Sequence, residues 1–300
     1  MTKFDTKMDR YPFVPITKRP VYEWPNGKRL AVYFAINIEA FEFGRNPGPD
    51  FTTMPTAPFH RGYAYRDYGN RVGAWRLLDM FDELNIPLSV LTNAAVYDAY
   101  PELVAAFRNR GDEFVGHGRT NSERQVDMTE DQEREMLREV CARFEHEEGS
   151  APKGWLGPFI SQSAKTPELL VENGFRYMLD WFFDEQPQLF RTDNGPILSV
   201  PYPSMELNDL PAIFNRKVSD EEFASLLIDA FDQQLEDSRK YPLVYCIALH
   251  TFVMGQPHRA RRLRHALEHI VRQRGDIWLT TAGEIAKYTL SLPKGVLIEP

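Results

Sequence analysis

The sequence is poor in cysteine and has no long uncharged apolar run. Only two cysteines, Cys141 and Cys246, occur among the 300 residues, and both stand in apolar segments far apart in the chain. Two such cysteines fit buried free thiols in a reducing compartment better than a disulfide framework. No stretch of about 18 uncharged apolar residues occurs, so we expect no membrane-spanning helix. The first ten residues are too charged for a signal peptide, and we therefore expect a cytoplasmic protein.

An excess of basic charge is also absent. Lysine and arginine total 35 against 43 aspartates and glutamates, which gives a formal charge of -8. Nucleic-acid surfaces usually form basic patches or stripes, and the one dense basic run, 258–264, also fits the start of a helix. We therefore expect a small-molecule substrate, with no nucleic-acid or membrane partner. The length and a hydrophobic content of 43% suit a single catalytic domain over residues 1–300, with an extended proline-containing arm over about residues 1–28.

Short apolar runs alternate with amphipathic segments along the chain. The first run, 29–38, reads RLAVYFAINI, and its valines, isoleucines and aromatics are typical of a strand buried on both faces. Repetition of this pattern predicts an α/β fold, a distorted (β/α) barrel of about seven parallel strands. Residues 45–64 form a connection longer than usual, and we expect a loop that covers a site. The pattern then predicts an amphipathic helix over 68–85.

Short motifs, most of them with polar residues, stand where five of the apolar runs end. In a barrel of parallel strands such ends converge on one mouth, so side chains from distant parts of the sequence meet there. Packing alone does not explain five such motifs at strand ends. The five segments are Asn37-Ile38-Glu39, Gly116-His117-Gly118-Arg119-Thr120-Asn121, Gly157-Pro158-Phe159, Leu179-Asp180-Trp181 and Leu249-His250.

Three of these polar residues favour catalysis. Glycines flank His117, so a ligand can approach it closely, and His250 would face the same mouth from another strand. Glu39 follows so apolar a strand that its carboxylate must find a partner or lie at the mouth. The plain structural alternatives are a core histidine for His250 and a salt bridge to Arg45 or Arg71 for Glu39.

The other polar positions have stronger structural alternatives. Thr120 and Asn121 fit a turn in which side chains bond the local backbone. Asp180 fits a cap of the following turn. His258 comes directly after Pro257, and a proline at the start of a helix is common.

The whole chain resembles the polysaccharide deacetylase superfamily, carbohydrate esterases with a distorted (β/α) barrel. Within it, the chain looks closer to the branch that contains the metal-independent allantoinase, which opens a ureide ring. The resemblance implies a hydrolase and a homo-oligomer, such as a tetramer, with the N-terminal arm in the contact. It covers roughly residues 11–290 and rests on RYPFVPITKRP with WPNGKRLAVYFAINIE, YGNRVGAWRLLDMF, GHGRTNS and LHTFVMGQPHRARRL.

The resemblance also implies a metal site with altered ligands. Deacetylases of this superfamily use an aspartate base, and a second aspartate with two histidines holds zinc or a similar ion. The base position matches Asn37, and the ligand positions match Glu39, His117 and Asn121. Zinc usually takes three good protein ligands, so this set is marginal and the standard metal mechanism is in doubt.

Two further family motifs survive and one does not. Leu156 stands where deacetylases carry an arginine two residues before Pro-Phe, here Pro158-Phe159. The Asp-Trp pair is retained as Asp180-Trp181, and the Leu-His pair as Leu249-His250. The loss of the base, one ligand and the arginine together resembles the allantoinase-like branch.

We therefore predict a hydrolase of a non-peptide carbon–nitrogen bond in a small cyclic amide, imide or ureide. It would need no cofactor, or would use a weakly held divalent metal such as zinc on Glu39, His117 and Asn121. Glu39 and His117 would activate water, His250 would protonate the leaving nitrogen, and Asp180 would orient a catalytic neighbour. The predicted substrate-binding residues are Asn37, Asn121, Phe159, Trp181 and His258.

Two alternatives remain open at this point. The first is a metal-dependent N-acetyl sugar or polysaccharide deacetylase, which would need an open groove for its substrate. The second is a non-catalytic ligand-binding protein on the same scaffold, because Asn37, Asn121 and Leu156 each remove a chemical group that the family uses.

Overall fold

The computed structural model describes residues 8–45 and 60–300. In this part of the chain the strands are β1 (Leu30–Ile38), β2 (Leu88–Thr92), β3 (Glu113–Gly116), β4 (Gly154–Trp155), β5 (Tyr177–Met178), β6 (Gln188–Phe190), β7 (Ile197–Ser199), β8 (Leu243–His250) and β9 (Ile277–Thr280). The α-helices are α1 (His60–Tyr68), α2 (Ala74–Glu83), α3 (Val96–Ala99), α4 (Pro101–Arg110), α5 (Glu130–Glu148), α6 (Thr166–Glu172), α7 (Asp220–Asp237), α8 (Thr251–Met254), α9 (Pro257–Val271) and α10 (Ala282–Leu290).

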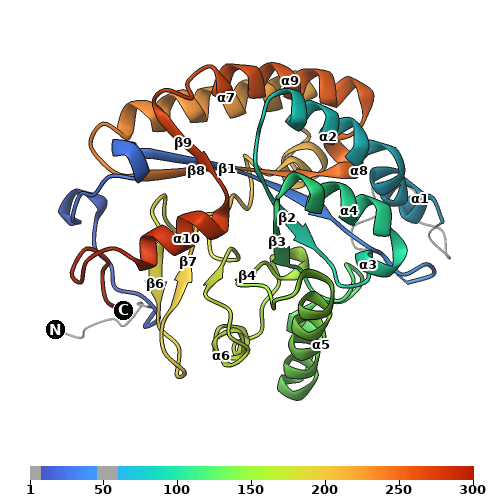
Figure 1. Cartoon of the computed structure of the whole chain (residues 1–300), viewed down its shortest axis with the longest axis horizontal. Helices are drawn as coiled ribbons and strands as arrows, with labels where there is room; N and C mark the ends of the chain where they lie inside the picture. Colours follow the sequence, from blue (N-terminus) through green and yellow to red (C-terminus); the bar gives the residue numbers. More distant parts are fainter. Residues whose placement is uncertain (1–7, 46–59) are drawn as a thin grey trace.

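The strands form one curled sheet in the order β6-β7-β5-β4-β3-β2-β1-β8, with β9 beside β1 (Figure 1). All neighbouring pairs in this sheet are parallel except β6 with β7. Helices α7 and α9 pack side by side along the outer face next to β8. This open half-barrel confirms the predicted α/β fold with a distorted parallel barrel.

Alternation along β1 sends its side chains to two separate cores. The even-numbered residues of β1 pack beneath the helices, whereas Ala31, Tyr33 and Ala35 pack inside the barrel. Because successive side chains of a strand point to opposite faces, Asn37 and Glu39 continue the interior row. Both faces of β1 are buried, which explains why its sequence is apolar throughout.

The same alternation directs two histidines to the interior. Val115 lies inside the barrel on β3, and His117 follows two positions later. Cys246 and Ala248 lie inside on β8, and His250 ends that row. Parallel register then pairs Asn37 with His250 across β1 and β8, so the carboxyl ends of these strands lie together.

An irregular segment lies against the edge of the sheet that β8 forms. Asn208 forms an isolated parallel bridge with Ala248, and the Ala248 N–H donates to the Leu207 carbonyl at 3.0 Å. This contact places residues 203–215 against the end of β8. The segment contains no regular strand and ends in a π-helical turn over Pro211–Asn215.

The helix predicted over 68–85 and the loop predicted over 45–64 need correction. Helix α1 already begins at His60, and residues 46–59 of the expected loop lie outside the described residues. A π-helical turn, Gly69–Gly73, separates α1 from α2. A Cβ atom on Gly73 would lie 2.2 Å from the Thr251 carbonyl oxygen, so this close contact with α8 requires glycine and deforms the helix.

Three smaller expectations concern the arm, the cysteines and membranes. Residues 8–28 run along the body without an α-helix, and Trp24 is buried there with its indole N–H donating to the Leu243 carbonyl at 3.0 Å. Cys141 and Cys246 are both free thiols, as expected. Among the described residues, no helix has the length and apolar character needed to span a membrane.

Candidate active site

A cavity of about 270 Å³ lies at the carboxyl ends of β1, β3 and β8. Its wall is largely apolar, and polar groups gather on the side of the strand ends. Of the predicted site residues, the following line this cavity: Asn37, Glu39, His117, Asn121, Phe159 and His250. Residues from four separate sequence motifs therefore share one small pocket, as convergence of parallel strand ends requires.

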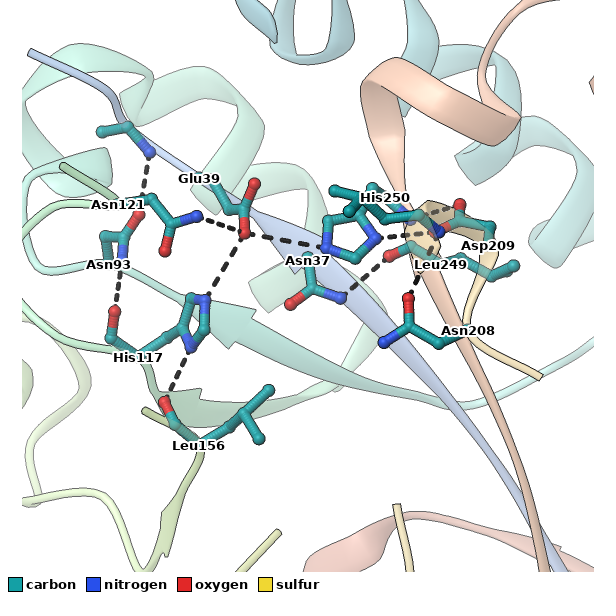
Figure 2. Close-up of polar contacts among 12 residues, drawn as sticks. Asn37, Glu39, Asn93, His117, Asn121, Leu156, Asn208, Asp209, Leu249 and His250 are labelled. Atoms are coloured by element: carbon teal, nitrogen blue, oxygen red, sulfur yellow. Dashed lines mark hydrogen bonds and ion pairs between the residues drawn. The ribbon is translucent and has the colours of Figure 1, made fainter. Parts of the chain in front are cut away.

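Glu39 is the centre of the polar group (Figure 2). Its Oε1 atom accepts a hydrogen bond of 2.8 Å from the Asn121 side-chain amide. The Nε2 atoms of His117 and His250 lie 3.5 and 3.8 Å from the same oxygen. The alternative of a salt bridge to an arginine is wrong for both candidates, because Arg45 pairs with Glu42 and Arg71 with Asp67.

His117 is held by its other ring nitrogen. Nδ1 lies 2.7 Å from the carbonyl oxygen of Leu156, and a carbonyl only accepts, so Nδ1 carries the proton. Nε2 is left facing Glu39 and the pocket. In the described part of the chain, three buried atoms here have no hydrogen-bond partner: His117 Nε2, Glu39 Oε2 and Asn121 Oδ1. Such atoms are costly unless a ligand or water meets them.

His250 is held in a similar way by a residue that the sequence did not reveal, Asp209. The His250 Nδ1 atom lies 2.7 Å from Asp209 Oδ1, which fixes the proton on Nδ1. Asp209 is fully buried, whereas His250 is 8% exposed and turns Nε2 toward Glu39. The core-histidine alternative thus holds for one ring nitrogen only, since the other faces the pocket.

These contacts move the pKa values of Glu39 and His250 in opposite directions. Burial alone would raise the pKa of Glu39, but the adjacent imidazole of His117 and the charge of His250 hold it below its ordinary value. Burial alone would lower the pKa of His250, but the carboxylates of Asp209 and Glu39 raise it above the usual range of imidazole. A carboxylate base and an imidazolium acid can therefore coexist near neutral pH.

Asn93 ties two of the strand ends together and was also missed. Its Oδ1 atom accepts from the Ala40 N–H at 2.9 Å, and its Nδ2 atom donates to the His117 carbonyl. Asn93 follows β2, so the rule that polar residues gather at strand ends would have pointed to it. Its two bonds hold the segments that carry Glu39 and His117 at a set spacing.

Two more residues at the pocket come from places without a sequence signal. The Tyr202 hydroxyl accepts from Asn37 Nδ2 at 3.3 Å, and that amide also donates to the Leu249 carbonyl at 3.1 Å. The guanidinium of Arg66 lies 5.0 Å from the ring centre of Phe41 and lines the pocket from α1. Asn37 is therefore already engaged in the barrel, and Arg66 brings positive charge to the wall.

Three predicted residues lie outside the pocket. Asp180 accepts from the Gly157 N–H at 2.8 Å, and Trp181 donates its indole N–H to Gln162 at 2.7 Å. Both follow β5, which is separated from β1 by three strands of the sheet. His258 is mostly exposed in the first turn of α9, 3.4 Å from Asp220. The structure thus does not bring Asp180, Trp181 or His258 to the cavity that holds Glu39.

The residues at the metal position do not fit a zinc site. Glu39 and His117 are good donors, but the Asn121 amide already turns its NH₂ group to Glu39. In the described ranges, no group of three or more histidine, cysteine, aspartate or glutamate side chains is placed to hold a metal ion. Zinc sites normally take three strong protein ligands, so the donor set falls one short.

Comparisons with known proteins agree with this architecture, although no family model matches the chain. A candidate polysaccharide deacetylase of Schizosaccharomyces pombe is 25% identical, covering 91% of this chain and 93% of the relative. The crystal structure of a candidate polysaccharide deacetylase of Pseudomonas aeruginosa superposes with a TM-score of 0.78 at 26% identity, covering 93% of this chain and 97% of that one. The predicted resemblance to the polysaccharide deacetylase superfamily is confirmed.

A third likeness concerns the allantoinase-containing branch of the superfamily. The crystal structure of Puue allantoinase superposes with a TM-score of 0.80 at 25% identity, covering 94% of this chain and 99% of that one. The chain therefore spans nearly the whole length of these superfamily proteins. Their shared barrel accounts for the placement of the strand ends, and the side chains there decide the chemistry.

Proposed function

We propose that the protein hydrolyses the amide carbon–nitrogen bond of a small non-peptide substrate. The observation that carries this proposal is the position of Glu39 between the Nε2 atoms of His117 and His250, at 3.5 and 3.8 Å. Amide hydrolysis needs a base for water and an acid for the leaving nitrogen, and this array supplies both. The superfamily relatives are named as hydrolases of this kind of bond, which supports the proposal.

In the first step, Glu39 takes a proton from a water molecule. Its low pKa keeps the carboxylate ionised at neutral pH, and the Nε2 atom of His117, the free ring position beside it, accepts a hydrogen bond from the same water. The water oxygen forms a bond to the amide carbon, and the carbonyl electron pair moves onto oxygen. Arg66 on the pocket wall supplies positive charge to this oxygen.

In the second step, His250 gives the proton on Nε2 to the leaving nitrogen. The electron pair on the oxyanion re-forms the carbonyl bond as the carbon–nitrogen bond breaks with its own pair on nitrogen, and the products are a carboxylic acid and an amine or an opened ring. Asp209 holds the remaining proton on Nδ1 and stabilises the protonated imidazole before the transfer. The nearby Glu39 contributes to the same stabilisation.

Two substrate classes fit this chemistry, and different observations favour them. The names of the deacetylase relatives favour removal of an acetyl group from nitrogen, and this support is the broader one. A cavity of only about 270 Å³ favours the predicted ring amide, imide or ureide, and so does the lack of a third strong zinc donor among the described residues. The allantoinase neighbour supports the ring substrate as well. None of the three proteins compared above is named as a non-catalytic protein.

The deciding experiment offers the purified protein a panel of substrates with and without chelator. The panel contains an N-acetylglucosamine oligomer, allantoin, hydantoin and succinimide. Acetate release identifies a deacetylase, and ring opening identifies a cyclic-amide hydrolase. Replacement of His250 by alanine should lower either activity by about a hundredfold or more. Saturable binding without turnover of any member would contradict the proposed function.

A further inference from the structure

A single peptide group connects His117 to Asp180. The Leu156 carbonyl oxygen accepts from His117 Nδ1 at 2.7 Å, and the Gly157 N–H donates to Asp180 Oδ1 at 2.8 Å. This C=O and this N–H belong to the same planar peptide unit, whose resonance couples its two ends. The hydrogen bonds therefore form one unbroken chain from the Asp180 carboxyl group to the pocket nitrogen of His117.

We propose that Asp180 is a positioning residue that acts on His117 through the Leu156–Gly157 peptide. It sets the proton on Nδ1 and strengthens the basicity of Nε2 without touching the substrate. The proposal deepens the proposed function, because it rests on the part assigned to His117 in water activation. It also gives a specific route to the expectation that Asp180 orients a catalytic neighbour.

The chain of bonds crosses the ends of three neighbouring strands. His117 follows β3, the peptide follows β4 and Asp180 follows β5. Backbone bonds hold the three ends in register, since Leu156 N–H donates to the Gly116 carbonyl at 3.0 Å and Leu179 N–H to the Trp155 carbonyl at 2.9 Å. This chain of hydrogen bonds from Asp180 to His117, which we call the relay, is thus part of the sheet, and the sheet limits its freedom to rearrange.

The surroundings leave the connecting peptide little room to rotate. A Cβ atom on Gly157 would lie 2.4 Å from the Ser161 carbonyl oxygen and 2.9 Å from Asp180 Oδ1. Only glycine permits this approach, so residue 157 brings its N–H to the carboxylate by having no side chain. His117 and Leu156 are 2% and 1% exposed, and water does not compete for the bond between them.

The physical effect follows from polarisation along the chain. A carboxylate that accepts from a peptide N–H pushes electron density through the peptide onto the carbonyl oxygen at the other end. That oxygen then binds the Nδ1 proton more strongly, and imidazole that donates strongly at Nδ1 is a better acceptor at Nε2. Condensed-phase estimates put the mutual strengthening of linked hydrogen bonds at roughly 10–30% per bond, and the low dielectric of a buried site favours the effect.

Histidine NMR tests the relay without any substrate. Protein labelled with ¹⁵N-histidine contains seven imidazoles, and His117→Gln identifies the signal of residue 117. Asp180→Ala should move the Nδ1 proton signal of His117 upfield and make its exchange with water at least about tenfold faster. Asp180→Asn keeps an oxygen that accepts from Gly157, so it should restore slow exchange with a smaller upfield shift.

A matched control and a folding check separate relay from general damage. Asp184→Asn changes a nearby carboxylate that pairs with Arg19 instead, and it should leave the His117 signal unchanged. Thermal melting shows whether each variant is folded, and if Asp180→Ala is not, the shift in Asp180→Asn decides. An unchanged Nδ1 signal in the folded Asp180 variants would overturn the relay. A shifted signal together with an inactive substrate panel would overturn only the proposed function.

Discussion

Asp209 binds His250 twice. One carboxylate oxygen lies 2.7 Å from the imidazole Nδ1, and the other accepts the backbone N–H of the same residue, also at 2.7 Å. The two bonds fix the ring and the main chain at the end of β8 together. As a result, the free Nε2 atom of His250 stays 3.8 Å from Glu39 Oε1, at the edge of the pocket.

Loss of Asp209 should therefore lower turnover without preventing binding. Asp209→Ala frees the His250 ring and removes the charge that favours its protonated form, and we expect kcat to fall by about a hundredfold. The measurement is steady-state kinetics on the active member of the substrate panel. Asp232→Asn is a matched control, because Asp232 contacts His269 at the same 2.7 Å on the surface. Equal kinetics in the Asp209 variant and this control would contradict the role of Asp209.

The opposite pKa shifts of Glu39 and His250 predict a bell-shaped pH profile of kcat/KM. Activity should fall at low pH as Glu39 gains a proton, below the ordinary value of 4.5 because its pKa is lowered. It should fall at high pH as His250 loses its proton, above 6.5 because that pKa is raised. Asp209→Asn removes a charge that raises the pKa of His250, so the alkaline limb should move to lower pH. If the alkaline limb of Asp209→Asn lies at the same pH as in the unaltered protein, a group other than His250 causes that limb.

The donor set predicts weak zinc binding that one substitution should strengthen. Glu39 and His117 are two strong donors, and Asn121→His adds a third beside them. We expect zinc affinity to rise at least about tenfold, measured by calorimetry and by metal analysis after dialysis. The variant that also carries His117→Ala should lose the gain. About one tightly held zinc per chain of the unaltered protein would contradict this account of the site.

Much of the barrel and part of the site follow from the sequence because long strands carry their own signals. The runs that became β1 and β8 are buried on both faces, and their ends expose Glu39 and His250 to one pocket. Every second side chain of a strand points to the same face. Because Tyr33 and Cys246 lie in the interior, Glu39 and His250 are expected there as well.

The remainder depends on contacts that no local pattern reveals. Asp209 comes from an irregular segment, and it reaches His250 because Asn208 pairs with Ala248 near the end of β8. Strands β4 and β5 have two residues each, too few to show periodicity, so the position of Asp180 relative to the pocket was not predictable. His258 carries a motif-like sequence but belongs to an exposed helix turn.

The buried Asp180 carboxyl group predicts that Asp180→Asn becomes more stable than the unaltered protein as the pH rises. Burial raises its pKa from 3.8 to about 7, although the N–H of Gly157 opposes this shift. A raised carboxyl pKa stabilises the fold below the unfolded value, and this contribution is lost as pH rises from 3.8 to about 7. Asp180→Asn cannot ionise, so its advantage in free energy of unfolding should increase by at least about 1 kcal/mol over that range. Urea unfolding of both proteins at pH 5 and pH 8 measures this difference. An equal difference in free energy of unfolding at the two pH values would contradict the prediction.

The backbone at Phe159 predicts that stability and substrate affinity can be separated. Phe159 lines the pocket with φ of 61° and ψ of 17°, and Ile160 follows with φ of 53°. This left-handed conformation costs a residue with a side chain about 1–2 kcal/mol, and such strain often lies at functional sites. Phe159→Gly should therefore retain or increase the free energy of unfolding.

The same variant should bind substrate more weakly. It removes an aromatic wall that is 37% exposed, so we expect KM to rise at least about tenfold with a smaller change in kcat. Asn85→Gly relieves a similar left-handed conformation, φ 48°, on an exposed residue outside the pocket lining, and it should leave KM unchanged. An unchanged KM in Phe159→Gly would mean that this strained turn serves packing alone. A raised KM with preserved stability would show that the strain places the ring against the substrate.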